Sequence, residues 1–413
     1  MKTICLAGVL GACAIALMAA PASAESWARS WAASPQAPTP SGGRFPGSPT
    51  FNDQTVRQIV RLSGGGSKVR VRFTNEYGTA PLQVGGAHVA LAGDDGSAIR
   101  PGSDHVLTFG GKTTATIAPG APLLSDPVDM KTAPLSRLAI SLYLPGAVDS
   151  CTCHGTAMQV GYIASGDATG AAQLTDPKPL QQRALISGVD VASARPAKTI
   201  VAYGDSITDG VGSTSGANRR WPDQLADRLV KRGGAAVDVA NEGISGNRVL
   251  GDGAGVSALA RFDRDVLSTP GLAYVIVFEG INDIGIGYAP KDGPNARFFA
   301  ASGTPPTAED LIGAYRQLIA RAHEKGVKIY GATIAPYEGA AYASPEGNKV
   351  REAVNHWIRT GHGFDGVLDF DAAMRDPAHP TQIKPGFHMG DHLHGSDAGY
   401  AAVAKSIDLK LFK

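Results

Sequence analysis

The spacing of hydrophobic residues changes once along the chain, near residues 193–198. Before that point, apolar and polar residues alternate in short segments. In residues 68–73 the valines and the phenylalanine share one face, and the basic side chains share the other. Glycine and proline separate these segments, and no stretch has helical periodicity. The pattern predicts an all-β region over residues 26–196, arranged as a β-sandwich.

Residues 54–62 form another alternating segment just before residues 68–73. The connection between them reads Ser63-Gly64-Gly65-Gly66-Ser67, and glycine adopts a positive φ without steric cost. We therefore expect these two segments to pair with each other as a β-hairpin.

After Lys198, apolar strands alternate with amphipathic helices, which is typical of a parallel sheet covered on both faces. A helix is expected over residues 308–325, with Thr307 and Asp310 arranged to cap its start, and Ser344-Pro345 starts another. The expected strands are residues 199–203, 236–240, 273–279, 327–334 and 366–370.

Length and charge limit what the chain can be. Its 413 residues exceed what one hydrophobic core usually organises, so we expect two domains. The 43% hydrophobic and 18% charged residues are near globular averages. A formal net charge of +1 offers no general attraction for nucleic acid or an anionic membrane surface. The oligomeric state is not indicated.

The N-terminus resembles a cleaved secretory signal. Lys2 precedes an apolar run over residues 4–20, and Ala22-Ser23-Ala24 supplies the small residues of a cleavage site. A membrane anchor is the alternative, but the run is short for a spanning helix of roughly 20 residues. We expect a signal peptide over 1–24, a β-sandwich domain over 25–195, an α/β domain over 196–413, and a secreted or periplasmic protein without stable membrane insertion.

Two cysteines remain after the signal is removed, Cys151 and Cys153. An oxidising compartment permits a disulfide between them. They can alternatively stay as free thiols, or bind a metal together with the adjacent His154, although no fourth ligand is evident.

Polar residues with catalytic potential follow three of the predicted strands. Ser206 follows the first strand, Gly246 the second and Asn282 the third, and an Asp391-x-x-His394 pair lies near the C-terminus. The carboxyl ends of parallel strands lie at one edge of a sheet, so we expect these residues to meet there.

These residue types suit nucleophilic catalysis. A serine hydroxyl attacks a carbonyl only when an imidazole accepts its proton, and the imidazole needs a carboxylate to fix its tautomer. Asp391 and His394 can supply both groups to Ser206. Backbone N–H groups of Ser206 and Gly246, with the Asn282 amide, can stabilise the negative oxygen of the tetrahedral intermediate.

The four blocks, in this order, resemble those of the SGNH, or GDSL-like, hydrolases over most of residues 199–413. The first block has isoleucine after Gly-Asp-Ser where the family name has leucine. The β-domain is similar to those of SGNH carbohydrate esterases and arylesterase-like proteins. The resemblance implies a flavodoxin-like three-layer α/β/α domain, here after a jelly-roll-like sandwich.

The same resemblance implies a serine esterase that needs no cofactor or metal. Ser206 would be the nucleophile, Asp391 and His394 would complete the triad, and Ser206, Gly246 and Asn282 would form the oxyanion hole. The implied substrates are small-molecule or polysaccharide esters, with short acyl groups such as acetyl on carbohydrates. A lipase, phospholipase or arylesterase of broader acyl range is one alternative, and a carbohydrate-binding protein with a degenerate hydrolase domain is another.

Several residues admit competing interpretations. Asp376 and His379 repeat the Asp-x-x-His spacing, but Asp391 and His394 are favoured because a helix start at Ser396 follows them. The residues around this pair could instead form a metal cluster: His388, Asp391, His392 and His394.

Two further features concern substrate contact. The glycine-rich residues 251–255 are interpreted as a flexible loop beside the active site. Tyr77, Phe109 and Tyr143 could form a sugar-binding platform on the β-domain, or could belong to its core.

Overall fold

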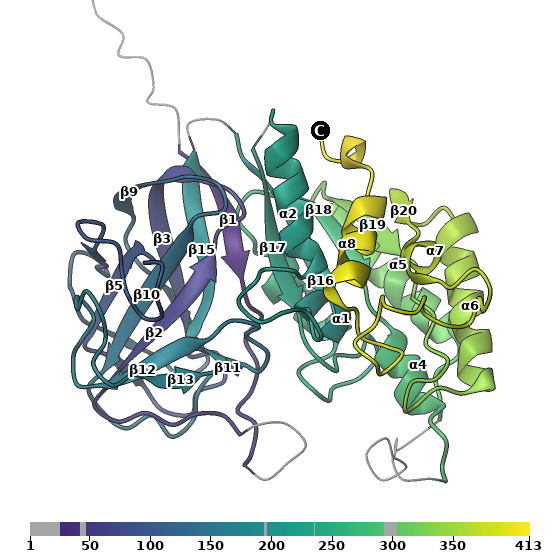
Figure 1. Cartoon of the computed structure of the whole chain (residues 1–413), viewed down its shortest axis with the longest axis horizontal. Coiled ribbons are helices and arrows are strands. Elements are labelled where there is room, and N and C mark those ends of the chain that lie inside the picture. The colour runs from purple at the N-terminus through teal and green to yellow at the C-terminus, as the bar shows by residue number, and fades with distance from the viewer. Residues whose placement is uncertain (1–24, 42–46, 194–195, 235, 293–303) are drawn as a thin grey trace, which may run out of the picture.

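The computed structural model describes residues 25–41, 47–193, 196–234, 236–292 and 304–413 (Figure 1). The expected signal peptide, residues 1–24, lies outside the described residues. None of the helices in the described ranges has both the length and the apolar character needed to cross a bilayer.

The N-terminal half consists of antiparallel strands in two main sheets that face each other, as a β-sandwich (Figure 1). The five-stranded sheet contains β1 (Ser26–Ala32), β15 (Ile186–Ser193), β3 (Gly66–Thr74), β8 (Pro122–Leu124) and β9 (Val128–Thr132). The six-stranded sheet contains β13 (Lys178–Leu180), β12 (Gly161–Ser165), β2 (Gln54–Arg61), β10 (Arg137–Leu144), β5 (Gly86–Leu91) and β6 (His105–Val106). Two small sheets pair β4 (Leu82–Val84) with β7 (Ala115–Ile117), and β11 (Cys153–His154) with β14 (Arg183–Ala184).

The expected hairpin between residues 54–62 and 68–73 is wrong. Strand β2 pairs with β10 and β12, whereas β3 pairs with β15, β8 and β9 in the opposite sheet. Val56 and Val60 of β2 and Val69 and Val71 of β3 belong to one buried core. The apolar faces of the two strands therefore pack face to face across the sandwich, and the glycine-rich connection crosses between sheets that are roughly 10 Å apart.

The C-terminal half is a five-stranded parallel sheet in the order β17-β16-β18-β19-β20. Counted along this half of the chain, the order is 2-1-3-4-5, which is the predicted flavodoxin-like arrangement. The strands are β16 (Lys198–Gly204), β17 (Val237–Gly243), β18 (Leu272–Phe278), β19 (Lys328–Ala332) and β20 (Gly366–Leu368).

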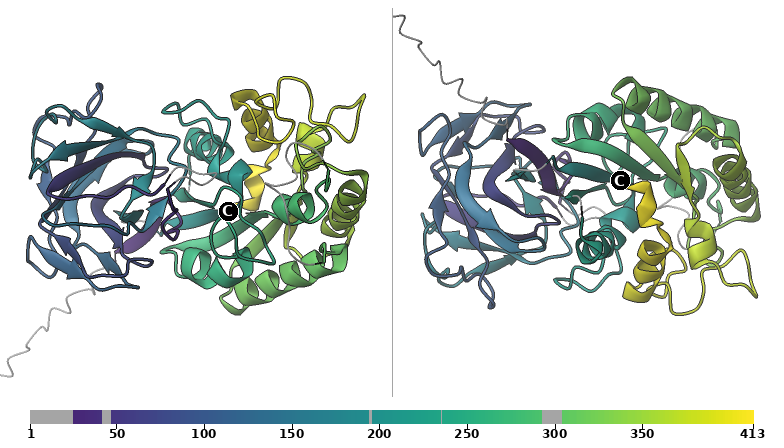
Figure 2. Two further views of the ribbon diagram at one scale, coloured as in Figure 1. Left: turned by 90° about the horizontal axis from the view of Figure 1, so that it is seen from below. Right: turned by 90° about the horizontal axis from the view of Figure 1, so that it is seen from above.

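Helices cover both faces of this sheet (Figures 1 and 2). One face carries α2 (Trp221–Arg232), α7 (Phe370–Met374) and α8 (Asp397–Ser406), and the other carries α3 (Ala258–Phe262), α5 (Ala308–Glu324) and α6 (Pro345–Thr360). The short helices α1 (Ser206–Asp209) and α4 (Ile281–Gly287) start just after β16 and β18. A π-helical turn, η1 (Asp263–Leu267), and a 3₁₀ turn, η3 (Leu409–Leu411), complete the elements.

The helix starts agree with the sequence signals. The Thr307 side chain accepts from the Asp310 N–H, and Asp310 accepts from the Thr307 N–H at 2.8 Å, as a capping box requires. Ser344 caps α6, with Pro345 as its first residue.

The two halves meet along β1 and β17, the edge strands that lie side by side in Figure 1. The Arg29 N–H of β1 donates to the Thr199 hydroxyl at 3.1 Å, and the Val239 N–H of β17 donates to the Ser63 hydroxyl at 2.9 Å. These bonds connect the sandwich to the parallel sheet through buried polar groups.

Candidate active site

Ser206 lies at the tight turn between β16 and α1. Asp205 caps this helix, because its carboxylate accepts the Ile207 N–H at 2.9 Å. A Cβ on Gly204 would lie 2.3 Å from the Phe278 carbonyl oxygen, so this position accepts only glycine without displacement of the backbone. The turn places Ser206 at the start of the helix, with its side chain directed to the C-terminal loop and only 5% of the residue exposed.

The C-terminal loop brings His394 and Asp391 to this serine. Ser206 Oγ lies 2.8 Å from His394 Nε2, and His394 Nδ1 lies 2.6 Å from Asp391 Oδ2. Asp391 Oδ1 also accepts the N–H groups of Leu393 and His394, each at 3.0 Å. The arrangement is a continuous serine–imidazole–carboxylate chain in which each link is within hydrogen-bond distance.

The environment of Asp391 favours its charged form. Partial burial opposes ionisation, but the hydrogen bonds and the charge of His394, with the two backbone N–H groups, outweigh it and lower the pKa of Asp391 to about 2. The carboxylate can therefore hold the Nδ1–H tautomer of His394, which leaves Nε2 free to accept the serine proton.

The competing pair lies elsewhere. His379 Nδ1 contacts Asp376 Oδ2 at 3.1 Å, and 66% of the His379 side chain is exposed. His388 stacks on His392 with ring centroids 4.4 Å apart, and its Nδ1 accepts two backbone N–H groups of its own loop. No group of three or more His, Cys, Asp or Glu side chains in the described ranges is arranged to hold a metal ion.

The predicted oxyanion-hole residues lie on the turns that follow β16, β17 and β18. Gly246 has a φ of 81°, a left-handed conformation that favours glycine, and its N–H has no hydrogen-bond acceptor among the described residues. Asn282 Nδ2 donates to the Asn247 carbonyl at 2.9 Å, which places the Asn282 amide beside the Gly246 turn. The Ser206 N–H is at the unpaired N-terminal end of α1.

Tyr342 and Asp283 hold this region in place, and the sequence analysis missed both. The Tyr342 hydroxyl donates to Asn282 Oδ1 at 3.3 Å, so the amide nitrogen is directed toward residues 246–247. Asp283 accepts the N–H groups of Val249 and Leu250 at 2.7 and 2.9 Å. The adjacency of Asp283 to Asn282 could have suggested it, whereas no local signal marks Tyr342.

Several carboxyl groups lie buried beneath the site. Burial raises the pKa of Asp205 to about 7 and that of Asp283 to about 6, against the backbone hydrogen bonds that each accepts. Burial also raises the pKa of Glu279 well above its ordinary value, and neither of its carboxyl oxygens has a partner among the described residues. The raised pKa of Glu279 favours its neutral form, which limits the negative charge buried beneath the site.

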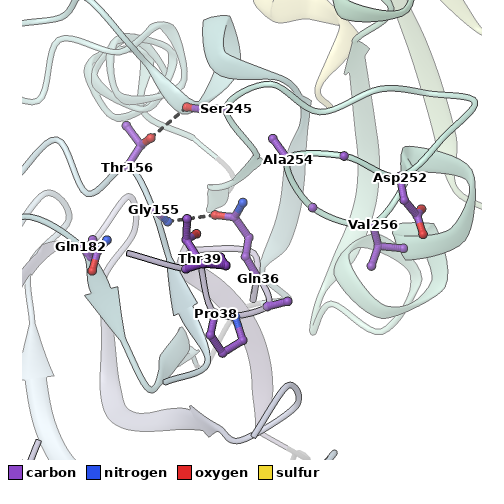
Figure 3. Close-up of a pocket in the computed structure, with 14 residues that line it drawn as sticks. Gln36, Pro38, Thr39, Gly155, Thr156, Gln182, Ser245, Asp252, Ala254 and Val256 are labelled. Carbon is purple, nitrogen blue, oxygen red and sulfur yellow. Dashed lines mark hydrogen bonds between the residues drawn. The ribbon is translucent and has the colours of Figure 1, made fainter. Parts of the chain in front are cut away.

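A cavity of about 490 Å³ opens beside the Gly246 turn, between the two halves of the chain (Figure 3). One wall comes from the sandwich, including Gln36, Thr39 and Thr156, and the other from Ser245 and the loop 252–256. The predicted glycine-rich loop therefore does line a cavity. Its walls carry amide and hydroxyl groups, the Asp252 carboxylate, and proline, alanine and valine side chains.

The three aromatic residues considered for a sugar platform each contact different partners. Phe109 belongs to the sandwich core and packs edge-on against Phe73. The Tyr77 hydroxyl accepts from Arg264 of the C-terminal half at 2.6 Å, and the Tyr143 hydroxyl donates to Asp53 at 2.7 Å. They do not form one platform.

Residues 202–402 match the model of the GDSL-like lipase/acylhydrolase family. The C-terminal domain belongs to this family. The resemblance inferred from the four sequence blocks is thus confirmed, and the chain is a carboxylic-ester hydrolase. No curated protein sequence matches the chain.

Solved structures of similar proteins match about half of the chain. A protein described as a lipolytic member of the G-D-S-L family from Desulfitobacterium hafniense is 20% identical, with 51% of this chain and 97% of that chain covered and a TM-score of 0.36. The lipase/acylhydrolase from Enterococcus faecalis is 20% identical (51% and 92% covered, TM-score 0.37). An acetyl xylan esterase from Geobacillus stearothermophilus is 22% identical (51% and 92% covered, TM-score 0.38).

Proposed function

We propose that the protein is an exported serine esterase that removes short acyl groups, such as acetyl, from carbohydrates. The observation that carries the mechanism is the chain from Ser206 Oγ through His394 to Asp391, with distances of 2.8 and 2.6 Å. It supplies a nucleophile, a base and an orienting carboxylate in one place.

The reaction proceeds in two halves. Ser206 Oγ bonds to the ester carbonyl carbon while its proton passes to His394 Nε2, and the N–H groups of Ser206 and Gly246 with the Asn282 amide stabilise the oxyanion. His394 then protonates the leaving alkoxide as the C–O bond breaks. Water, deprotonated by His394, attacks the acyl-enzyme and releases the carboxylic acid, which regenerates Ser206.

The cavity beside Gly246 supports a carbohydrate as the substrate. Its amide and hydroxyl groups suit the hydroxyl groups of an uncharged sugar, and its proline and alanine side chains suit the C–H faces of the ring. The structural neighbour from Geobacillus stearothermophilus is itself described as an acetyl xylan esterase.

A lipase of broader acyl range is the second candidate. Met389 and Leu250 are exposed by 55% and 37%, and they lie on the loops that carry Asp391 and follow Gly246. Apolar side chains exposed on two loops of the site could contact a longer acyl chain.

Hydrolysis of para-nitrophenyl acetate and octanoate by the mature protein and by Ser206→Ala tests both candidates. Acetate preference that Ser206→Ala abolishes, together with acetate release from acetylated xylan, supports the carbohydrate esterase. Octanoate preference supports the lipase. Undiminished hydrolysis by folded Ser206→Ala would contradict the mechanism.

Export rests on two features, the signal-like residues 1–24 and the disulfide between Cys151 and Cys153. Expression of the full chain in a secreting host, followed by N-terminal sequencing of the exported product, tests it. A mature protein that starts at Glu25 supports export, and an unprocessed product retained in the cytoplasm contradicts it.

A further inference from the structure

A short segment of the sandwich reaches the reaction centre of the GDSL-like domain. Cys151 and Cys153 form a disulfide, and His154 follows directly. His154 is only 5% exposed, and its two ring nitrogens are both engaged. Nδ1 lies 3.0 Å from the Ser34 carbonyl oxygen, and Nε2 lies 2.9 Å from Oδ1 of Asp209 in the GDSL-like domain.

Each of these two contacts requires a hydrogen atom between the ring nitrogen and the oxygen that it faces. A carbonyl oxygen can only accept, so Nδ1 carries a hydrogen. Nε2 then faces a carboxylate oxygen, and their contact is a hydrogen bond only with a proton between the two atoms. Burial opposes the charged imidazole, but the charge and the hydrogen bond of Asp209 outweigh burial and raise the pKa of His154.

The other oxygen of Asp209 holds the Gly246 turn. Asp209 Oδ2 accepts both the backbone N–H of Ser245 at 3.0 Å and its hydroxyl at 2.6 Å. Thr156 of the sandwich also contacts the Ser245 hydroxyl, at 2.9 Å (Figure 3). Ser245 directly precedes Gly246, and Asp209 ends the same helical turn that Ser206 begins.

Asp209 thereby joins the two backbone segments whose N–H groups face the oxyanion, and His154 is the side chain on its remaining oxygen. The neighbouring cation Arg220 is already engaged, because it binds both oxygens of Asp223 at 2.7 and 3.0 Å. Without His154, the buried Asp209 carboxylate would face no bonded cation and would have to shift or take up a proton.

We propose that His154 is a positioning residue for ester hydrolysis: through Asp209 it fixes the Ser245-Gly246 backbone in the geometry that stabilises the oxyanion. The sandwich thus completes the reaction centre of the GDSL-like domain. This inference rests on the proposed serine-esterase function for its kinetic consequence, but the hydrogen-bonded link itself can be measured without turnover.

His154→Gln tests the link, with His88→Gln as the matched control. His88 makes an equivalent contact with Asp104 at 2.7 Å, on β5 in the sandwich sheet remote from the GDSL-like domain (Figure 1). We expect His154→Gln to lower kcat on para-nitrophenyl acetate about 10- to 100-fold with KM within about twofold, because a small misplacement of the oxyanion donors acts on the transition state. Inhibition by phenylboronic acid, whose serine adduct is tetrahedral, should weaken in parallel.

Hydrogen–deuterium exchange provides the readout that needs no activity. In His154→Gln the peptide covering residues 243–249 should exchange faster, because the Ser245 N–H loses a fixed acceptor, whereas His88→Gln should leave it unchanged. Exchange and kcat in folded His154→Gln equal to those of His88→Gln would overturn the proposal.

A failure of the variant to fold and a failure of the esterase mechanism can each be distinguished from a failure of this proposal. If His154→Gln does not fold, His154→Asn decides, because its shorter amide side chain removes the same contact to Asp209. Faster exchange over residues 243–249 supports the link and unchanged exchange overturns it. If Ser206→Ala retains full activity while His154→Gln still accelerates exchange, the esterase mechanism fails and the structural link stands.

Discussion

At the scale of single residues, the local environment gives chemically identical carboxyl groups different pKa values. Asp391 accepts hydrogen bonds from His394 and the loop backbone, and its pKa falls to about 2. Asp205, buried beneath Ser206, has a pKa raised to about 7. Of these two carboxyl groups, only Asp391 is suited to stabilise an imidazolium, because it stays ionised throughout the pH range in which histidine titrates.

Asp391→Asn should lower kcat on para-nitrophenyl acetate by about 10⁴-fold, because an amide can hold His394 in the wrong tautomer. Asp376→Asn is the matched control, since Asp376 has the same spacing to a histidine, at the surface. Steady-state kinetics of the two variants check the assignment. Equal losses in both, or a greater loss in Asp376→Asn, would contradict it.

Tyr342→Phe should lower kcat several-fold with little change in KM. The variant removes one hydrogen bond, worth about 1 kcal/mol, that orients the Asn282 amide. Tyr143→Phe removes a tyrosine hydroxyl contact to Asp53 in the sandwich and should leave both constants unchanged. A change confined to KM in Tyr342→Phe would assign Tyr342 to substrate binding instead.

At the scale of elements, the ends of strands and the starts of helices set the positions of the candidate catalytic residues. Strand β16 ends at Gly204 and α1 begins at Ser206, so the proposed nucleophile lies at a turn capped by Asp205. Strand β18 ends at Phe278, just before the α4 turn that presents Asn282. The parallel direction of the strands gathers these ends at one edge of the sheet.

Helix α5 supports the sheet without touching the triad, so its cap should affect stability alone. Thr307→Ala should lower the free energy of unfolding by about 1 kcal/mol through loss of the capping box, and Thr307→Ser should retain most of it. Urea denaturation measures the difference, and kcat should equal that of the wild type. A loss of activity in folded Thr307→Ala would show a role that the structure does not indicate.

At the scale of the whole molecule, each half has its own main core, Ala32 of β1 joins the core of the C-terminal half, and the halves also share buried polar contacts. Ser34 of the sandwich donates to Glu242 at 2.5 Å and accepts from Arg261 at 3.1 Å. His154 and Asp209 add a further buried contact, at 2.9 Å. Such groups are costly to separate, so the interface should act as one unit with the active site.

The His154–Asp209 contact predicts a pH dependence of stability. The pKa of His154 is raised above its unfolded value of about 6.5, so its stabilising contribution is complete below about pH 6.5 and is lost as pH rises through the folded pKa. Asp209 faces the ring as a negative charge, and Glu242, whose pKa burial raises to about 7, gains its negative charge only as the pH rises through that value. Arg183 and Arg220 lie around the ring as positive charges.

Melting temperatures of the wild type and His154→Gln between pH 5 and 9 measure this contribution. The difference in Tm should be largest near pH 5–6 and should shrink toward pH 9. The same comparison for His88→Gln controls for a general effect of histidine loss. A Tm difference between the wild type and His154→Gln that stays constant or grows with pH would show that His154 and Asp209 do not share a proton.

Much of the architecture was predictable because its signals are local. The change of hydrophobic period separated a sandwich from an α/β domain, and the capping residues Thr307 and Ser344 marked helix starts that the structure contains. Ser206, Gly246 and Asn282 were identifiable because each follows a strand within a few residues. The Asp391-x-x-His394 spacing is equally short.

Other features depended on packing between distant segments. The alternation in β2 and β3 predicted two strands with an apolar face, but an identical pattern suits strands paired side by side and strands facing each other across a core. Only the partners β10 and β15 distinguish these cases.

The sequence by itself determined the two fold classes, the order of the catalytic blocks and the residue types available for ester hydrolysis, because these depend on periodicity and short spacings. The tertiary structure alone decided that Tyr342 orients Asn282 across 60 residues, and that His154 contacts Asp209 across 55. Such contacts leave no local pattern, since they arise when separately folded elements pack and their buried polar groups must find partners.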